Sequence, residues 1–328
     1  MTAQDPVIVV TGGAGYVGGA ITAYLARAGV RTLVVDKQAP GPDHPGGWIR
    51  ASVGDESVWQ RIRDSVVVRA VIHCAGLIVA PESMRDPAPY FVENVAESMH
   101  MLAGMERVGL RVPLVFSSSA AVYGEPPVVP IPESTPCQPT TPYGQTKRQF
   151  EEALVWYGLA YGLPWMALRY FNAAGAFLRR AEQHRPETHL LPLTFTAAVR
   201  ERPITVYGDD YPTPDGTAIR DYVHVEDLAR AHLAAVEVLE EGRASQCINL
   251  GSGTGHSVRE MIHAVERVVG RALPADIQPR RPGDPAVLVA DIRRAREVLH
   301  WEPQVSSADR IVEDAWQAFR KWPQGTID

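Results

Sequence analysis

The glycine-rich segment near the N-terminus constrains the fold more than any other feature of this chain. A β-branched run, Val7–Val10, leads directly into Thr11-Gly-Gly-Ala-Gly-Tyr-Val-Gly18, and a helical pattern follows over Gly18–Ala28. In this context Gly12 permits a tight turn, Gly15 lets the backbone approach a pyrophosphate, and Gly18 lets the helix pack closely on the strand. The start of the helix then presents unpaired amides to phosphate oxygens. The segment therefore predicts a dinucleotide-binding βαβ unit.

A carboxylate at the end of the second expected strand indicates which dinucleotide binds. Asp36 ends the strand Arg31–Asp36. At that position a carboxylate accepts hydrogen bonds from the adenine-ribose hydroxyls and repels the 2′-phosphate of NADP. Lys37 beside it offers some compensation for a phosphate, but the carboxylate favours NAD.

Buried apolar strands alternate with helical patterns through the first half of the chain. Further strands are expected at Ala70–Cys74, Val112–Ser117, Trp165–Arg169 and Cys247–Leu250, and helices at Val58–Arg63, about Val92–Val108, Lys147–Tyr161 and Val223–Leu239. Continuous Val/Ile/Leu strands without polar alternation indicate that helices cover both faces of a parallel sheet. The expected fold is therefore α/β, a Rossmann-type doubly wound parallel sheet.

After Phe171 the pattern changes. Arg179–Thr188 is charged and irregular, Gln278–Pro285 is rich in proline, and Val258–Pro323 resembles a series of mostly short helices. We therefore expect an NAD-binding Rossmann domain over residues 1–172, which also takes in about 221–250. A smaller, C-terminal mixed α/β substrate lobe over residues 173–328 is expected to be interleaved with it.

Composition excludes several classes of partner. The 328 residues carry 32 basic and 38 acidic side chains, a net charge of −6, and no basic block, which argues against nucleic acid. No apolar run approaches the roughly 18 residues of a membrane span, and the N-terminus has no signal-peptide pattern. Cys74, Cys137 and Cys247 lack metal-site spacing and are typical of free thiols in a reducing cytoplasm. We therefore expect a cytoplasmic protein without a bound metal.

A tyrosine and a lysine one helical turn apart suggest the chemistry. In Tyr143-Gly-Gln-Thr-Lys147 the phenol and the ammonium lie on one helix face. A free phenol has a pKa near 10, and a close ammonium together with a positively charged nicotinamide favours the phenolate. The run Ser117-Ser-Ser119 ends a parallel strand, where such sheets carry their sites. Ser119, Tyr143 and Lys147 are therefore the expected catalytic residues.

These motifs, in this order, resemble the extended short-chain dehydrogenase/reductase family. The two fingerprints are Thr11-Gly-Gly-x-Gly-x-x-Gly18 and Tyr143-x-x-x-Lys147, and the resemblance covers essentially the whole chain, closest to the UDP-glucose 4-epimerases. Supporting stretches are His73–Leu77, Phe116–Gly124, Arg169–Asn172, Gly208–Val225 and Arg281–Asp284. Gly208–Val225 is the most specific of them.

The resemblance implies reversible inversion at C4 of a UDP-sugar, with UDP-glucose and UDP-galactose as the pair. The reaction would pass through a 4-keto sugar with transient hydride transfer to tightly bound NAD, in a homodimer. The implied cofactor contacts are Gly12, Gly15, Tyr16, Val17, Gly18, Asp36, Lys37, Ser52, Val53, Cys74, Ala75, Gly76, Leu77, Asn94, Ser117, Tyr143, Lys147 and Tyr170. The implied substrate contacts are Ser119, Tyr143, Asn172, His189, Leu190, Thr205, Val206, Tyr207, Arg220, Arg281, Asp284 and Leu288.

Four positions depart from the pattern of that subfamily. Ser52 replaces an aspartate that contacts the adenine amino group, and Ile78 replaces a lysine beside the nicotinamide or the pyrophosphate. His189 replaces an asparagine near the UDP contacts, and Ala121 replaces a small hydroxyl residue near the sugar. None of them removes a catalytic group, but together they bear on sugar preference.

Several alternatives share the fold. A 4,6-dehydratase carries an Asp-Glu pair where this chain has Ala120 and Ala121, and a UDP-glucuronate decarboxylase would need a glutamate at Ala121. A 4-epimerase of UDP-GlcNAc/GalNAc or of UDP-glucuronate/galacturonate stays open, as does a non-catalytic NAD-binding sensor. Sensors of that kind typically lose the tyrosine or the lysine. By the resemblance, Leu288 lies at a gate beside the C2 substituent of the sugar, where its intermediate bulk favours glucose and galactose and allows weak action on the N-acetylated pair.

Overall fold

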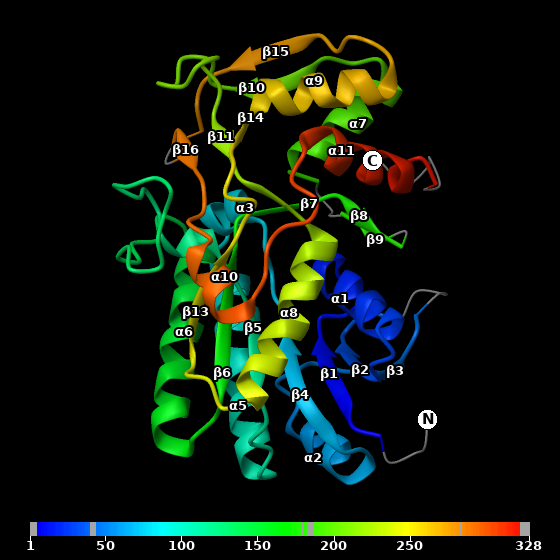
Figure 1. Cartoon of the computed structure of the whole chain (residues 1–328), viewed down its shortest axis with the longest axis vertical. Coiled ribbons are helices and arrows are strands. Elements are labelled where there is room, and N and C mark those ends of the chain that lie inside the picture. The colour runs from blue at the N-terminus through cyan, green and yellow to red at the C-terminus, as the bar shows by residue number, and fades with distance from the viewer. Residues whose placement is uncertain (1–4, 40–43, 179, 183–186, 282–283, 322–328) are drawn as a thin grey trace.

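The computed structural model describes residues 5–39, 44–178, 180–182, 187–281 and 284–321. Seven parallel strands form its central sheet in the order β13–β6–β5–β4–β1–β2–β3 (Figure 1). Their bounds are β1 Val7–Thr11, β2 Thr32–Asp36, β3 Gly47–Arg50, β4 Val68–His73, β5 Leu114–Ser119, β6 Trp165–Tyr170 and β13 Gln246–Leu250. The strand order reverses between β1 and β4, and ligands bind beyond the carboxyl ends of the strands at such a point.

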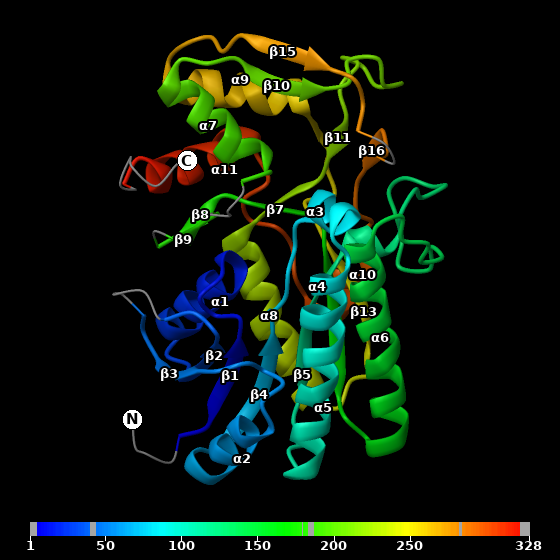
Figure 2. The same ribbon diagram turned by 180° about the vertical axis from the view of Figure 1, so that it is seen from behind.

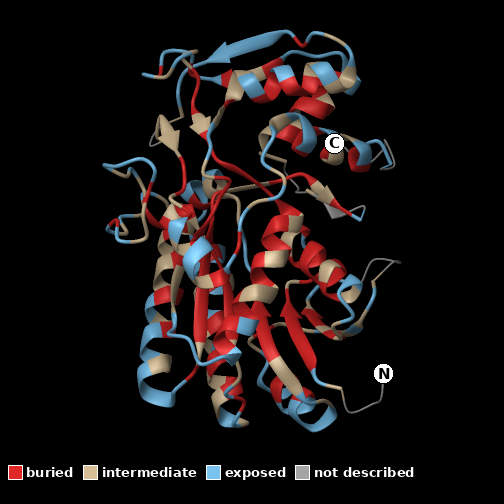
Figure 3. Cartoon of the chain, in the orientation of Figure 1, coloured by how far each residue is buried: buried red, intermediate tan, exposed pale blue. Residues whose placement is uncertain are grey.

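Helices cover both faces of this sheet, and the alternation of side chains along each strand divides the core in two. Ile8 and Val10 of β1 face a core that includes α1 (Tyr16–Arg27), α8 (Val225–Glu240) and α10 (Arg293–Leu299). Val7 and Val9 face the other core, with α2 (Glu56–Ser65), α5 (Glu97–Arg107) and α6 (Pro142–Tyr161). The strands are accordingly buried along most of their length (Figure 3).

Short helices and a π-turn connect β4 to α5, and a further turn follows β5. They are α3 (Ala80–Arg85), α4 (Ala88–Phe91), the π-helical η1 (Val92–Ala96) and, after β5, the 3₁₀ turn η2 (Ala120–Val122). α3 and α4 lie toward the carboxyl edge of the sheet (Figure 2), η1 continues α4, and η2 directly follows the carboxyl end of β5. They bring polar side chains to the edge at which parallel sheets carry their sites.

A second group of elements lies beyond that edge (Figure 2). It contains α7 (Leu190–Arg200), α9 (Val258–Val269) and α11 (Ala308–Phe319), which share a core around Phe195. Small sheets join distant segments: β7 (Asn172–Ala174) with β12 (Tyr222–His224), β8 (Ala176–Phe177) with β9 (Arg180–Ala181), β10 (Ile204–Tyr207) with β15 (Ala275–Gln278), and β11 (Ile219–Arg220) with β14 (His256–Ser257) and β16 (Val287–Leu288). We call this group the upper lobe.

The predicted fold class is confirmed, and several predicted elements are wrong. Val223 and His224 belong to strand β12 rather than to the helix expected over Val223–Leu239, because they pair with β7 some fifty residues earlier. Val258–Pro323 is not mostly short helices: α9 and α11 have 12 residues each, and strands β15 and β16 lie between them. Strand β3 was not expected.

The division into two domains stays a prediction. Pro282 and Gly283 of the proline-rich link, residues 179 and 183–186 of the charged stretch, and residues 322–328 at the C-terminal end lie outside the described residues. Among the described helices, none combines the length and the apolar character that crossing a membrane requires.

Candidate active site

The glycine loop has the steric features expected of a phosphate cradle. Gly12 has φ +73°, and a Cβ atom on it would lie 2.6 Å from the backbone nitrogen of Ala75. A Cβ atom on Gly18 would collide with the carbonyl oxygen of Gly12. Helix α1 begins at Tyr16 after Gly15, and no side chain caps its N-terminus. The loop is therefore closed to larger residues, and the first amides of α1 have no side-chain acceptor.

Asp36 lies against this loop. Its Oδ2 accepts a hydrogen bond from the amide of Ala14 at 2.9 Å, and its Oδ1 accepts one from the amide of Gln38 at 2.9 Å. Lys37 forms an ion pair with Glu93 of η1 at 2.7 Å. Because the ammonium of Lys37 is paired with that carboxylate, its compensation for a 2′-phosphate is weaker than the sequence suggests.

The loop after β4, Cys74–Leu77, is held by Asn94 from the π-turn η1. The Asn94 Oδ1 accepts from the Leu77 amide at 2.7 Å, and its Nδ2 donates to the Leu77 carbonyl at 2.9 Å and to Thr146 Oγ1 at 3.0 Å. Both amide hydrogens of Asn94 are thus used within the protein. π-turns occur often at functional sites, and here the turn links the loop to helix α6. A direct contact of Asn94 with the cofactor stays a prediction.

Ser52 and Val53 follow β3 at the same edge. The Ser52 hydroxyl donates to the carboxylate of Glu97, the first residue of α5, and the Val53 carbonyl accepts from Trp59 Nε1 at 2.8 Å. Sequence reasoning did not single out Glu97, since an acidic residue in the first turn of a helix is common for electrostatic reasons alone.

The three expected catalytic residues come together from β5 and α6. Ser119 ends β5, and Thr141 caps α6 by accepting from the Gly144 amide at 3.1 Å. Burial raises the pKa of Tyr143, and the hydrogen bond with Ser119 opposes that rise. The Lys147 Nζ lies 5.9 Å from the centre of the Tyr143 ring. The hydrogen bond with Ser119 thus offsets part of the effect of burial on the Tyr143 phenol.

Lys147 is itself buried, and its ammonium is held by the backbone of β5. Its Nζ donates to the Ser117 carbonyl at 2.9 Å, and it lies 4.8 Å from the centre of the Phe116 ring. Burial lowers the pKa of Lys147 to about 8, while the electrostatic influence of Cys74 and Glu151 opposes this. The protonation of the Lys147 side chain is therefore sensitive to the groups that surround it.

Further polar groups support this pair and were missed by the sequence reasoning. Ser83 of α3 is fully buried, and its Oγ accepts from the backbone amide of Tyr143 at 3.2 Å. Glu151 forms a buried ion pair with Arg169 at 2.7 Å and also accepts from Ser118 at 2.6 Å. A serine in a short helix carries no sequence signal for such a role, whereas a charge on the inner face of a predicted helix, as at Glu151, is a usable one.

In the upper lobe, four of the expected substrate residues form two contacting pairs, and each pair contains one arginine. Arg220 of β11, 9% exposed, contacts the carboxylate of Asp284. The guanidinium of Arg281 lies 4.1 Å from the centre of the Tyr207 ring. Tyr207 ends strand β10, which also carries Thr205 and Val206.

Leu288 and Asn172 lie close to this group through backbone pairing. Leu288 is the register partner of Arg220 and packs against a small cluster that includes Ala120 and Phe171. The amide of Asn172 donates to the Asp221 carbonyl at 2.8 Å. Leu288 thus pairs with the arginine through its backbone and packs against a cluster to which the residue after Ser119 belongs.

His189 and Leu190 lie at the start of α7, and His189 is surrounded by carboxylates. Its Nδ1 lies 2.9 Å from Glu187 Oε1 and 3.2 Å from Glu182 Oε1. Burial lowers the pKa of His189, but the two carboxylates outweigh burial, so the net shift is upward. The carboxylates of Glu182 and Glu187 therefore favour the protonated form of His189.

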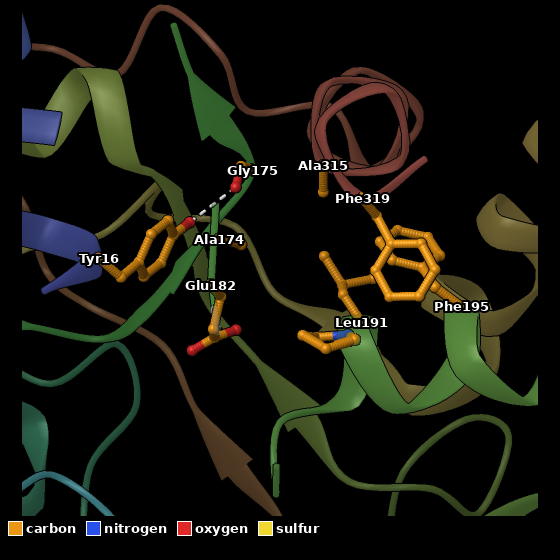
Figure 4. A pocket seen from close by; sticks show the side chains of 9 residues that line it. Tyr16, Ala174, Gly175, Glu182, Leu191, Phe195, Ala315 and Phe319 are labelled. Carbon is orange, nitrogen blue, oxygen red and sulfur yellow. Dashed lines mark hydrogen bonds between the residues drawn. The ribbon is translucent and has the colours of Figure 1, made fainter. Parts of the chain in front are cut away.

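A cavity lies between the start of α1 and the upper lobe. Tyr16, Glu182 and the apolar side chains of Leu191, Phe195 and Phe319 line it, and the Tyr16 hydroxyl donates to the Gly175 carbonyl at 2.8 Å (Figure 4). The Tyr16 side chain thus contacts the upper lobe, whereas the Tyr16 backbone lies beside the glycine loop. Among the described residues, no group of three or more His, Cys, Asp or Glu side chains could hold a metal ion.

Comparison with known proteins identifies the family. A family model described as the NAD dependent epimerase/dehydratase family matches residues 8–251. The UDP-glucose 4-epimerase of Lacticaseibacillus casei is 40% identical, over 98% of this chain and 99% of its own. The chain belongs to the NAD-dependent epimerase/dehydratase family.

Solved structures of epimerases have the same fold. The UDP-glucose 4-epimerase from Brucella ovis in complex with NAD is 40% identical, with a TM-score of 0.91 over 96% of this chain and 98% of its own. The enzyme from Bifidobacterium longum in complex with NAD⁺ and UDP is 34% identical, with a TM-score of 0.89 over 97% and 99%.

The cofactor of this family is NAD, and the residues present fit it. The glycine loop is a cradle that a Cβ atom would fill, and Asp36 stands beside it with Lys37 committed to Glu93. In this member of the epimerase/dehydratase family, Ala120 and Ala121 form the turn η2 directly after Ser119, so no acid follows the serine there. The features of the epimerase branch are therefore present and the acidic pair of the dehydratase branch is absent.

Proposed function

We propose that this enzyme interconverts UDP-glucose and UDP-galactose by inverting the configuration at C4 of the sugar, with NAD as its resident cofactor. One observation carries the proposal above the others. Ser119, Tyr143 and Lys147 lie together at the carboxyl edge of the sheet, between a glycine loop that fits a dinucleotide and an upper lobe with Arg220 and Arg281 for a diphosphate.

In the proposed mechanism, NAD supplies a group that accepts a hydride from the sugar and gives it back. Tyr143, as the phenolate, takes the proton from the C4 hydroxyl and later returns a proton to the C4 oxygen. Ser119 is hydrogen-bonded with Tyr143 and would hold the same sugar oxygen. Lys147 places a positive charge near the phenol, and the Ser117 carbonyl keeps that charge in position. Between the two proton transfers the 4-keto sugar rotates within the pocket. Either face of C4 can then receive the hydrogen.

The upper lobe would bind the UDP portion of the substrate. Arginine guanidinium groups match the geometry of a diphosphate, so Arg220 and Arg281 are suited to its oxygens. Asp284 contacts Arg220 and can accept hydrogen bonds from ribose hydroxyls. Asn172, His189, Leu190 and Tyr207 border the same region and complete the proposed site.

Two alternatives are disfavoured by particular residues. A dehydratase needs a general acid and a base after the serine, where this chain has Ala120 and Ala121. A non-catalytic NAD sensor has no use for a tyrosine and a lysine one helical turn apart, and this chain keeps both Tyr143 and Lys147 on α6.

Sugar choice is proposed to depend on Leu288. Its backbone pairs with Arg220 and its side chain packs against the cluster that includes Ala120 and Phe171, which fits a position between the diphosphate and the sugar. Leucine fills less of the pocket than tyrosine and more than cysteine or serine. We therefore expect UDP-glucose and UDP-galactose as the preferred pair, with weak but measurable action on UDP-GlcNAc and UDP-GalNAc.

The proposed enzyme is a cytoplasmic homodimer. The outer face of α6 exposes Val155, Trp156 and Leu159, whose relative exposures are 43%, 68% and 73%. Apolar side chains gathered on one face are the usual mark of a protein interface. Sedimentation of Trp156→Glu/Leu159→Glu should give a monomer, whereas Val67→Glu, at an apolar residue that is 61% exposed elsewhere, should leave the dimer intact.

The test of the activity is to incubate the pure enzyme separately with UDP-galactose, UDP-GalNAc and UDP-glucuronate, and to resolve the products. Conversion of UDP-galactose to UDP-glucose without added NAD is the expected result. Accumulation of NADH with a keto product would instead identify a dehydrogenase, and absence of turnover with all three sugars would contradict the proposal.

A further inference from the structure

Asp221 is a fully buried aspartate that joins β11 to β12. Within the part of the chain that the structure describes, no lysine, arginine or histidine forms an ion pair with it. Buried carboxylates are rare unless they are paired, so this one needs another source of stabilisation. Burial raises the pKa of the Asp221 carboxyl, and hydrogen bonds from Ser252, Ala290 and Gly253 oppose that rise. The charge of Asp221 is therefore stabilised by hydrogen-bond donors rather than by a cation.

Three backbone amides from two separate segments donate to this carboxylate. Its Oδ1 accepts from the Ser252 amide at 2.6 Å, and its Oδ2 accepts from the amides of Gly253 and Ala290 at 3.1 Å each. Ser252 and Gly253 follow the end of β13, where successive amides form a concave site that suits an anion. Gly251 leaves the necessary room, because a Cβ atom on it would collide with Oδ2 of Asp221.

The backbone of Asp221 makes two further hydrogen bonds. Its amide donates to the Leu288 carbonyl of β16 at 3.0 Å, and its carbonyl accepts from the Asn172 amide at 2.8 Å. Asn172 lies two residues after the end of β6, and β6 is the neighbour of β13 in the seven-stranded sheet. Asp221 thus ties β16 to the carboxyl ends of two adjacent strands of that sheet.

Three of the residues proposed to bind the substrate are direct neighbours of Asp221. Arg220 precedes it in the chain, and Leu288 and Asn172 are hydrogen-bonded to it. The catalytic Ser119 is the register partner of Tyr170 at the end of β6. Strands β11 and β16 have two residues each, so their own pairing is too short to fix their distance from the sheet. The contacts of Asp221 supply that connection.

We propose that Asp221 is a positioning residue for the reaction: its carboxylate holds the strands that carry Arg220 and Leu288 at a fixed distance from the catalytic residues on the sheet. Asp221 is fully buried and acts through these neighbours rather than on the substrate. The consequence for turnover rests on the function proposed above, whereas the anchoring itself does not.

The anchoring is tested by amide hydrogen exchange. Asp221→Asn keeps the size of the side chain but has one acceptor oxygen instead of two, so at least one of the three amides loses its acceptor. Peptides that cover residues 251–254 and 288–291 should therefore exchange faster than in the parent protein. Unchanged exchange in both peptides would overturn the anchoring, whether or not the protein is an epimerase.

A matched control is available in Asp227, which is 1% exposed and accepts from the amides of Gln304 and Val305 at 2.9 Å each. Asp227→Asn should speed exchange around residues 303–306 and leave residues 251–254 as they are in the parent. It should also lower the melting temperature without lowering kcat, because Asp227 holds a segment that lies outside the proposed site.

The consequence is tested by turnover of UDP-galactose in the NAD-loaded enzyme. Asp221→Asn should lower kcat about tenfold, because a small misplacement of the sugar relative to Tyr143 slows the reaction. The Kd of UDP should stay within about threefold, since β11 and β16 remain paired with each other. Gly251→Ala displaces the carboxylate without changing its charge and should lower kcat by a similar factor. The double variant should be no slower than the slower single variant.

Unchanged kcat in a folded, NAD-loaded Asp221→Asn or Gly251→Ala variant would overturn the positioning role, as would losses that add in the double variant. A loss of UDP affinity as large as the loss of kcat would also overturn it, because the defect would then lie in binding. Failure of the proposed function would look different. The parent enzyme would not convert UDP-galactose at all, and hydrogen exchange would still report the anchoring.

Discussion

The cofactor half and the substrate half of this molecule are built on different physical grounds. In the cofactor half, neighbouring parallel strands are buried on both faces, and the glycine loop leaves no room for a Cβ atom. In the upper lobe, strand β15 is exposed along its whole length and, among the described strands, pairs only with β10, and the expected substrate residues contact one another through side chains, Arg220 with Asp284 and Arg281 with Tyr207. Backbone packing thus determines the first half, whereas pairs of side chains determine the second. Substitutions in the glycine loop should therefore abolish NAD retention outright, whereas substitutions in the upper lobe should weaken substrate binding by degrees.

The largest expected effect concerns the residue between the two halves. Tyr143→Phe removes the phenol proposed to take the C4 proton, so kcat should fall by at least about 10²-fold while UDP binding survives. Turnover and UDP affinity should be measured on the same preparation. Tyr157→Phe is the control and should remain active. Tyr157 lies on the same helix but packs against the core that the sheet shares with α2 and α5. Near-normal turnover of Tyr143→Phe would exclude this residue as the base.

The next effect is tested within the cofactor half, with a pair of glycines. Gly12 and Gly29 have φ of +73° and +76°, so alanine at either position costs about 1–2 kcal/mol of backbone strain. Only at Gly12 does the new Cβ also meet another segment, 2.6 Å from Ala75 N, whereas nothing lies within 4 Å of it at Gly29. Gly12→Ala should therefore purify without NAD, and Gly29→Ala should retain it, as measured by the ratio of absorbance at 260 and 280 nm. Equal retention in both variants would contradict the steric account of the loop.

A graded effect is expected in the upper lobe. Arg220→Gln should raise KM for the UDP-sugar about 10- to 100-fold, because a charge-assisted pair of hydrogen bonds is lost, and it should leave kcat and bound NAD nearly unchanged. The control is Arg280→Gln, whose guanidinium pairs with Asp210 at 2.6 Å in the same lobe and has no assigned contact to substrate. A loss of NAD in Arg220→Gln would show that the two halves are not independent.

A smaller effect sharpens the picture of sugar choice. Leu288→Tyr should abolish the weak action on UDP-GalNAc and spare UDP-galactose, because the larger ring fills the space proposed for the N-acetyl group. Rates with the two sugars should be compared at equal enzyme concentration. If the ratio of the two rates does not change, Leu288 is only a packing residue of the cluster around Ala120 and Phe171.

The smallest effect is on stability and depends on pH. The pKa of His189 is raised in the folded protein by Glu182 and Glu187 against the effect of burial. A group with a raised folded pKa stabilises the protein fully below its unfolded pKa, and this stabilisation is lost as pH rises through the folded pKa. The melting temperature of the parent should exceed that of His189→Asn by about 1–2 °C at pH 5.5, and the difference should vanish by pH 9. A difference that grows with pH would contradict the assigned pairing.

Sequence alone predicted the parts of the site whose signal is local. The glycine spacing, Asp36 at a strand end, and the Tyr143–Lys147 turn each reflect a short-range rule, and the structure brings these residues to one edge of the sheet. Strand β3 was missed because only its two middle residues, Trp48 and Ile49, are apolar, and β12 was taken for part of a helix because its partner β7 lies fifty residues away. The roles of Asn94 and Ser83 were likewise not visible, since each depends on a contact with a distant segment.

The sequence by itself determined the class of sheet and the preference for NAD, and it predicts Tyr143 and Lys147 as the catalytic pair, because each follows from residue types at fixed local spacing. The tertiary structure decided which side chains are paired and which are free to meet a ligand. It joined Lys37 to Glu93, Ser52 to Glu97, and Arg220 to Asp284. It also surrounded the Asp221 carboxylate with backbone amides of two other segments. The physical reason is that backbone preferences act between near neighbours, whereas the charge and hydrogen-bond state of a buried side chain depends on whichever groups the fold brings within about 3 Å of it.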